Sequence, residues 1–113
     1  MFTQPLVSVI IPAFNVEKYI YESIDSVLKQ KYSNLEILIL DDNSKDNTLS
    51  IIKSFNDKRI KYYSNKKNIG ISSCLNKLID YSSGQFICRM DADDIMHKHK
   101  IYLQMKFMLK NKL

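Results

Sequence analysis

The 113-residue sequence has few residues that break regular structure, with 2 glycines and 2 prolines. This scarcity excludes a collagen-like or linker-like chain. Cysteine is equally rare, because Cys74 and Cys88 are the only two and form no CxxC pair. A disulfide scaffold and a cysteine-based metal site are therefore excluded. With 45% hydrophobic and 26% charged residues, we expect residues 1–113 to form a single globular domain.

Long hydrophobic runs are also missing from the start of the chain. The longest apolar run there is Val9-Ile10-Ile11, far shorter than a signal peptide or a membrane span. No basic start precedes it. Together with the two unpaired thiols, this predicts a cytoplasmic protein.

Arginine is rare although the formal net charge is +5, because Arg59 and Arg89 are the only arginines among 17 basic residues. The lysines are spread along the chain, which is typical of a solvated surface, and we expect no nucleic-acid partner. One group at the end of the chain is compatible with peripheral contact with an anionic membrane face. These lysines are Lys98, Lys100, Lys106, Lys110 and Lys112.

Four β-rich runs alternate with four helical patterns. The strands are predicted at 6–11, 35–40, 60–63 and 85–90, and three of them are nearly continuous apolar runs, typical of strands covered on both faces. Each helix shows an apolar stripe. The stripes consist of Ile20, Ile24, Val27 and Leu28; Leu49, Ile52 and Phe55; Ile71, Leu75, Leu78 and Ile79; and Ile101, Met105, Met108 and Leu109.

This order predicts an α/β protein with an open, mostly parallel β-sheet flanked by helices, similar to a Rossmann sheet. In such a sheet, ligands bind beyond the carboxyl ends of the strands. Asn15 is a candidate cap for the first helix, with Glu17 in its first turn. The fourth helix is expected to start near Ile95.

Polar clusters follow three of the strands: Pro12-Ala13-Phe14-Asn15, Asp41-Asp42-Asn43-Ser44 and Asp91-Ala92-Asp93-Asp94. Grouped carboxylates are costly unless a positive charge neutralises them. Asp91 and Asp93 form a DxD pair that suits Mn²⁺ or Mg²⁺ bridging a diphosphate. The alternative is that the acidic run caps a helix or lies on a solvated loop.

The other clusters are open to two interpretations as well. Asp42 is suited to accept a hydrogen bond from a base edge, or it belongs to a turn. Phe14 is either a platform for a base or a core side chain. Asn68 and Gly70 form a small turn before a helix, which weakly indicates phosphate or base contact. The sequence has no GxGxxG and no GxxxxGK[ST] motif, so dinucleotide and P-loop sites of those types are excluded.

Four segments in this order resemble the nucleotide-binding half of family 2 glycosyltransferases, which have the GT-A fold. The segments are VSVIIPAFNVEKYIYESIDSVLKQ, LEILILDDNSKDNT, NKKNIGISSCLNKLI and GQFICRMDADD. The resemblance runs from about Leu6 to the last helix. It implies transfer of a sugar, with inversion, from a nucleoside diphosphate sugar, with a UDP-sugar favoured. The implied acceptor is a saccharide or a lipid-linked molecule of cell-surface polysaccharide synthesis.

The resemblance also implies roles for individual residues. Pro12, Ala13 and Phe14 would line the nucleoside pocket with Asn15 beside them, and Asp42 would read the base. Glu17, Asn68 and Gly70 match recurrent family positions of the nucleotide-sugar site. Asp91 and Asp93 would hold Mn²⁺ or Mg²⁺ at the diphosphate.

The chain departs from the family pattern in two respects. Many members have an arginine where this chain has Leu75, so another cation must supply that charge, and Lys66, Lys67 and Arg89 are candidates. The family's acceptor half and its general base lie beyond the DxD pair. We therefore expect a chain truncated before the acceptor half, with no catalytic base to assign and an unpaired sheet edge that favours self-association.

Two alternatives remain at this stage. One is a non-catalytic remnant that binds nucleotides. The other is a receiver-like phosphoacceptor domain, since ILILDD followed by ICRMD is similar to the acid pair and phosphorylated aspartate of a response regulator. The second alternative leaves the first strand and helix unused.

Overall fold

The computed structural model describes residues 3–111, in which four strands and four helices alternate. The elements in chain order are β1 (Val7–Ala13), α1 (Ile20–Leu28), β2 (Leu35–Asp41), α2 (Thr48–Lys53), β3 (Ile60–Ser64), α3 (Ile71–Tyr81), β4 (Phe86–Arg89) and α4 (Lys100–Lys110). The predicted order of elements is confirmed.

The four strands form one parallel sheet in the order β3-β2-β1-β4. This is the order of the first four strands of a Rossmann sheet, and the chain reverses direction across the sheet between β1 and β4. In a receiver domain the strand that ends in the acid pair lies directly beside the strand that ends in the phosphorylated aspartate, whereas here β1 separates the corresponding strands β2 and β4. The receiver-like alternative is therefore wrong.

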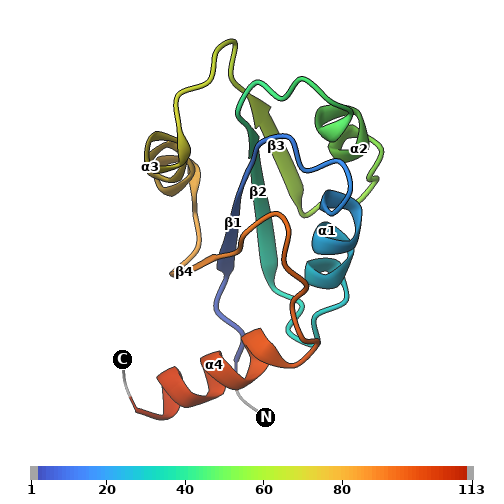
Figure 1. The fold of residues 1–113 in the computed structure, drawn as a ribbon. Coiled ribbons are helices and arrows are strands. Elements are labelled where there is room, and N and C mark those ends of the chain that lie inside the picture. The colour runs from blue at the N-terminus through green and yellow to red at the C-terminus, as the bar shows by residue number, and fades with distance from the viewer. Residues whose placement is uncertain (1–2, 112–113) are drawn as a thin grey trace.

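Helices cover both faces of the sheet (Figure 1). Because side chains alternate along a strand, Val9 and Ile11 face α1 and α2, whereas Ile10 packs with Cys74 and Leu78 of α3. Helix α4 lies beyond the end where the strands begin (Figure 1), and its Ile101 and Met105 side chains join the core on the α1 side. In the range 3–111, no helix is long and apolar enough to cross a membrane.

Strand β4 differs from the sequence prediction. Strands β1 and β2 are buried almost throughout, as expected, but the side chains of β4 alternate between half-buried and exposed. The reason is that β4 pairs only with β1 among the described residues, so its outer edge has no neighbour. The self-association expected from an unpaired edge stays a prediction.

Two predicted helix starts are wrong. Helix α1 begins at Ile20, and the Asn15 side chain accepts a hydrogen bond from the Lys45 N–H instead of capping the helix. Glu17 consequently lies in the turn before α1. Helix α4 begins at Lys100 rather than near Ile95, so the acidic run after β4 does not cap it.

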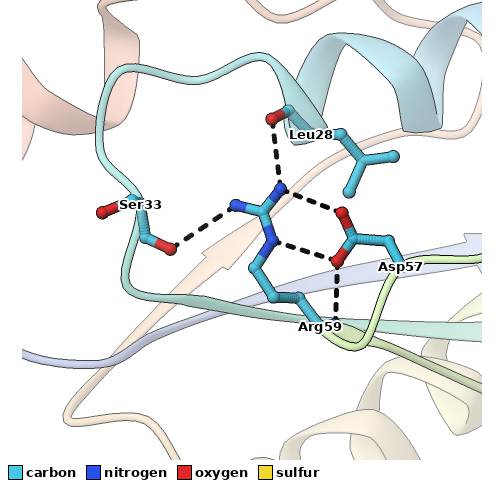
Figure 2. Close-up of polar contacts among 4 residues, drawn as sticks. All are labelled: Leu28, Ser33, Asp57 and Arg59. Carbon is cyan, nitrogen blue, oxygen red and sulfur yellow. Dashed lines mark hydrogen bonds and ion pairs between the residues drawn. The ribbon is translucent and has the colours of Figure 1, made fainter.

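Arg59 fastens the amino end of β3 to the loop after α1 (Figure 2). Its guanidinium contacts both carboxylate oxygens of Asp57, at 3.1 and 3.2 Å, and donates to the carbonyls of Leu28 and Ser33. This fork holds a bidentate geometry that a lysine ammonium cannot reproduce. One of the two arginines is thus committed to the fold.

A buried carboxylate holds β4 in place at its amino end. Glu36 of β2 is 6% exposed and accepts hydrogen bonds from the Ser8 hydroxyl, the Ser83 N–H and the Lys61 ammonium. The Ser8 hydroxyl in turn accepts from the Gly84 N–H at 2.8 Å. A Cβ at Gly84 would lie 2.5 Å from Ser8 Oγ, so only glycine allows this approach. The network therefore anchors the turn that leads into β4.

Replacing Glu36 with glutamine should reduce stability at neutral pH. Burial by itself raises the Glu36 pKa, but the hydrogen bonds from Ser8, Ser83 and Lys61 outweigh it and hold the pKa below its ordinary value of 4.5. A lowered pKa contributes stability above pH 4.5 that is lost as the pH falls through the folded-state pKa. Glu36→Gln should lower the free energy of unfolding by about 1–3 kcal/mol at pH 7, with a smaller deficit near pH 3, measured by urea unfolding.

The matched control is Glu22→Gln, which removes the same charge from an exposed position. It should change the free energy of unfolding by less than about 0.5 kcal/mol at either pH. Equal effects of the two substitutions, or a Glu36→Gln deficit that does not depend on pH, would contradict the anchoring role.

Candidate functional site

A cavity of about 530 Å³ lies at the carboxyl ends of β1, β2 and β4, beside the loop that leads into α3. Parallel strands bring their ends to one edge of the sheet, and the cavity lies at the point where the strand order reverses. Its lining residues are Pro12, Ala13, Phe14, Val16, Asp42, Asn68, Gly70, Ile71, Cys74, Arg89, Asp91, Ala92 and Asp93.

Eight of the ten predicted site residues line this cavity. Asn15 and Glu17 do not, and their polar groups bind the loop before α2. Asn15 has a left-handed backbone with φ 51°, its N–H donates to Ser44, and the Glu17 carboxylate accepts from the Asn47 N–H at 3.0 Å. These two residues join the loop after β1 to the loop after β2, which supports the cavity wall from outside.

Asp42 organises the loop between β3 and α3. It is 4% exposed; one carboxylate oxygen accepts from the Ile69 N–H and the Asn65 side chain, and the other accepts from the Gly70 N–H, all at 2.9 Å. Burial by itself raises the Asp42 pKa, but these hydrogen bonds outweigh it and lower the pKa below its ordinary value. The carboxylate is therefore held ionised at neutral pH, at the wall of the cavity.

Gly70 allows the loop to present its N–H to Asp42. Its φ of 88° is in the region that glycine adopts without strain, and no atom lies within 4 Å of a Cβ built there. The requirement for glycine at this position is conformational, in contrast to the steric requirement at Gly84.

Three exposed carboxylates follow β4. Oxygen atoms of Asp91, Asp93 and Asp94 lie within 4.8 Å of one another, and Asp91 and Asp93 line the cavity. The hydroxyl of buried Ser23 in α1 lies within hydrogen-bonding distance of the Ala92 and Asp94 carbonyls, which fixes this loop on the helix. Three carboxylates so close together form a set of hard oxygen donors that suits Mg²⁺ or Mn²⁺.

The structure adds three side chains that the sequence interpretation did not place at the site. Ile71 was expected in the buried stripe of α3, yet it is 54% exposed and faces the cavity with Phe14, which is 47% exposed. Val16 also lines the cavity, as does Cys74, whose pKa is raised to about 11 by burial and by the nearby Asp42 carboxylate. The position of Ile71 directly after the Gly70 turn was the available signal, because residues that begin a helix there face the carboxyl edge of the sheet.

The fold and the cavity define a class: a parallel α/β domain with a polar, acid-lined site at the strand-order reversal. Comparison with known sequences identifies the family. Residues 8–113 match the model of the family "Glycosyl transferase family 2", and the chain belongs to this family.

Among its relatives is an Escherichia coli protein, the UDP-Glc:alpha-D-GlcNAc-diphosphoundecaprenol beta-1,3-glucosyltransferase WfgD. It is 44% identical over 108 residues, which cover 96% of this chain and 43% of that protein. A putative glycosyltransferase of Bacillus subtilis, EpsE, is 36% identical over 115 residues, covering 99% of this chain and 41% of the relative. The chain thus spans less than half the length of these relatives.

Solved structures show the same GT-A fold. Staphylococcus aureus TarS 1-349 in complex with UDP-GlcNAc superposes with a TM-score of 0.87 at 30% identity, over 92% of this chain and 31% of TarS. The mannosyltransferase PcManGT of Pyrobaculum calidifontis, in complex with GDP-Man and Mn²⁺, has a TM-score of 0.86 at 24% identity, covering 94% of this chain and 33% of the enzyme. The GT-A resemblance drawn from the sequence is confirmed.

Asp42→Asn should loosen the loop from Asn65 to Gly70. An amide offers one acceptor oxygen where the carboxylate offers two, so at least one N–H donor loses its partner. We expect the Ile69 and Gly70 amides to exchange with deuterium at least tenfold faster, measured by NMR, because a lost charge-assisted bond is worth about 1.5–3 kcal/mol.

The control is Asp80→Asn on the exposed surface of α3, which removes one charge without touching the loop. It should leave the exchange of both amides unchanged. Unchanged exchange in Asp42→Asn as well would show that Asp42 does not organise the loop.

Proposed function

We propose that this chain is the donor-binding part of a glycosyltransferase that takes a sugar from a nucleoside diphosphate sugar, a UDP-sugar by preference. The acceptor is a saccharide or a lipid-linked molecule in cell-surface polysaccharide synthesis, and transfer inverts the anomeric carbon. The observation that carries the proposal is the single cavity that combines two exposed apolar side chains, Phe14 and Ile71, with the carboxylates of Asp42, Asp91 and Asp93.

The residues that line this cavity offer two kinds of chemistry, apolar surface and carboxylates. Phe14 and Ile71 offer apolar surface to the flat face of a base, which has a π-face available for stacking. Asp42 also lines the cavity and is an acceptor, because it is ionised. An acceptor fits the N–H of a uracil ring. Asp91 and Asp93 follow β4, which lies on the opposite side of β1 from β2 and Asp42, and there they would meet the diphosphate.

A divalent cation fits the donor set after β4. Asp91 and Asp93, with Asp94 beside them, would hold Mn²⁺ or Mg²⁺, and the bound ion supplies neutralisation of the charge that develops on the departing diphosphate. The residues of the chain fix the loop that carries these carboxylates, through Ser23. In the segment 3–111, we assign no general base for the acceptor hydroxyl.

The relatives support the choice of donor and acceptor. The name of the E. coli relative gives UDP-glucose as donor and a lipid-linked GlcNAc as acceptor, and TarS was solved with UDP-GlcNAc. The chain spans less than half the length of these proteins. The proposal that it takes part in sugar transfer, rather than in donor binding alone, therefore draws its support from the relatives. A non-catalytic nucleotide-binding remnant would share the donor site and lack transfer, which an assay with UDP-glucose and a GlcNAc-diphospholipid distinguishes.

Metal-dependent nucleotide binding tests the donor site. Isothermal titration should detect UDP binding in the presence of Mn²⁺, and removing Mn²⁺ with EDTA should weaken it at least tenfold. The double substitution Asp91→Asn with Asp93→Asn should have the same effect, because the remaining carboxylate, Asp94, is too little to hold a divalent ion tightly.

The control is the double substitution Glu22→Gln with Asp80→Asn, which removes two exposed acids that do not line the cavity. It should leave UDP affinity within about twofold. Absence of binding to UDP, GDP and other nucleotides, or binding that ignores both Mn²⁺ and the substitution of Asp91 and Asp93, would overturn the proposed function.

We propose further that the protein is cytoplasmic and contacts the membrane face through α4. Asp94 is the last acidic residue of the sequence. On α4, the exposed Leu103 and Phe107 side chains lie among the exposed Lys106 and Lys110. Apolar side chains surrounded by lysines are typical of helices that bind an anionic membrane surface. Lys112, which was also expected to contribute, lies outside the described residues.

Vesicle binding tests this contact. The protein should cosediment with phosphatidylserine-containing vesicles and not with phosphatidylcholine vesicles, because each lysine near an anionic surface contributes about 1 kcal/mol. Lys106→Glu with Lys110→Glu should abolish most of the binding. The matched pair Lys66→Glu with Lys67→Glu, in the exposed loop before α3, should retain it. Binding that does not respond to lipid charge, or equal loss in both pairs, would contradict the contact.

A further inference from the structure

The donor cavity is poor in positive charge. Three carboxylates line it, from Asp42, Asp91 and Asp93, and Arg89 is the one cationic side chain of the described chain that does so. A nucleoside diphosphate sugar adds at least two more negative charges. One divalent cation does not balance this set, so a further positive group at the diphosphate would stabilise the complex.

Arg89 lies at the end of β4, two residues before the first carboxylate of the acidic loop. Its guanidinium is 3.2 Å from an Asp91 oxygen, and both side chains are about half exposed, at 52% and 51%. Exposed ion pairs contribute little to stability, so this pair exchanges partners readily. The other arginine, Arg59, has no such freedom, because its fork is occupied by Asp57 and two carbonyls.

The structure also separates the three cations that the sequence offered as the positive group at the diphosphate. Leu75, where many family members have arginine, packs with the core on the α3 side. Lys66 and Lys67 are exposed and do not line the cavity. Of the three candidate cations, Arg89 alone is placed at the site.

We propose that Arg89 binds the diphosphate of the nucleotide sugar, and that it becomes available when a divalent cation takes the Asp91 carboxylate from it. This inference rests on the proposed donor-binding function. The planar guanidinium fork matches phosphate oxygens. Asp91, one of the carboxylates that would hold the ion, lies 3.2 Å from Arg89, so a diphosphate bound beside Asp91 would be within reach of the arginine. Without metal, the ion pair keeps Asp91 engaged.

If Arg89 exchanges Asp91 for the diphosphate, removing it should affect the affinities for Mn²⁺ and for UDP differently. Its removal frees Asp91, so Mn²⁺ alone should bind equally well or more tightly. The same removal takes a charged hydrogen-bond donor from the diphosphate, so UDP should bind more weakly. Loss of a merely structural contact would weaken both ligands, and removal of an uninvolved surface charge would affect neither.

The experiment compares the wild type with Arg89→Ala, Arg89→Lys and the surface control Lys66→Ala. Mn²⁺ affinity without nucleotide is measured by electron paramagnetic resonance, UDP affinity at saturating Mn²⁺ by isothermal titration, and uridine affinity by NMR chemical-shift titration. Arg89→Ala should weaken UDP binding about tenfold or more, leave uridine binding unchanged and not weaken Mn²⁺ binding. The UDP affinity of Arg89→Lys should fall between those of the wild type and Arg89→Ala. Lys66→Ala should match the wild type in all three affinities.

Each outcome separates this inference from the proposed function. If the wild type binds UDP with Mn²⁺ and Arg89→Ala binds it equally well, the role of Arg89 is wrong and the donor site stands. If Arg89→Ala weakens Mn²⁺ and uridine binding along with UDP, Arg89 acts on the fold of the loop and the proposed exchange is wrong. If the wild type binds no nucleotide, both fail. Thermal unfolding of each variant confirms that it is folded, and Arg89→Gln replaces Arg89→Ala if that variant unfolds.

Discussion

The parallel pairing of β1 with β4 is the interaction on which the candidate site depends. It aligns Val7 with Phe86 and Ile10 with Arg89, and it continues in the bond from the Met90 N–H to the Ile10 carbonyl. This register brings the loop after Ala13 beside the acidic loop that starts at Asp91. Without it, Phe14 and the carboxylates of the acidic loop would belong to separate surfaces.

Side-chain hydrogen bonds at both ends of β4 maintain its pairing with β1. At the amino end, Glu36 and Ser8 hold the turn at Ser83 and Gly84. At the carboxyl end, Ser23 of α1 holds the acidic loop through its carbonyls. Strand β4 itself has only one neighbour in the described sheet, so these side-chain bonds supply order that a second neighbouring strand would otherwise provide. The buried network of Glu36 and Ser8 at the amino end of β4 thereby helps to position the carboxylates that follow its carboxyl end.

The carboxylates of the cavity fall into two groups with different physical roles. Asp42 is buried and its oxygens accept three hydrogen bonds from the chain, so it shapes the cavity wall and stays ionised. Asp91, Asp93 and Asp94 are exposed, and their oxygens are accessible to an external cation. Burial and these hydrogen bonds fix the Asp42 carboxylate in the cavity wall, whereas exposure leaves the other three carboxylates accessible to a cation.

The sequence by itself determined the alternation of strands and helices, the parallel sheet and eight of the thirteen residues that line the cavity. These features follow from local apolar periodicity and from the rule that parallel strands gather their carboxyl ends at one edge. Only the tertiary structure decided that Ile71 faces the cavity, that Asn15 and Glu17 bind a neighbouring loop, and that Arg89, not Lys66 or Lys67, reaches the site. Those outcomes depend on contacts between segments distant in sequence, and among them only the position of Ile71, directly after the Gly70 turn, left a local signal.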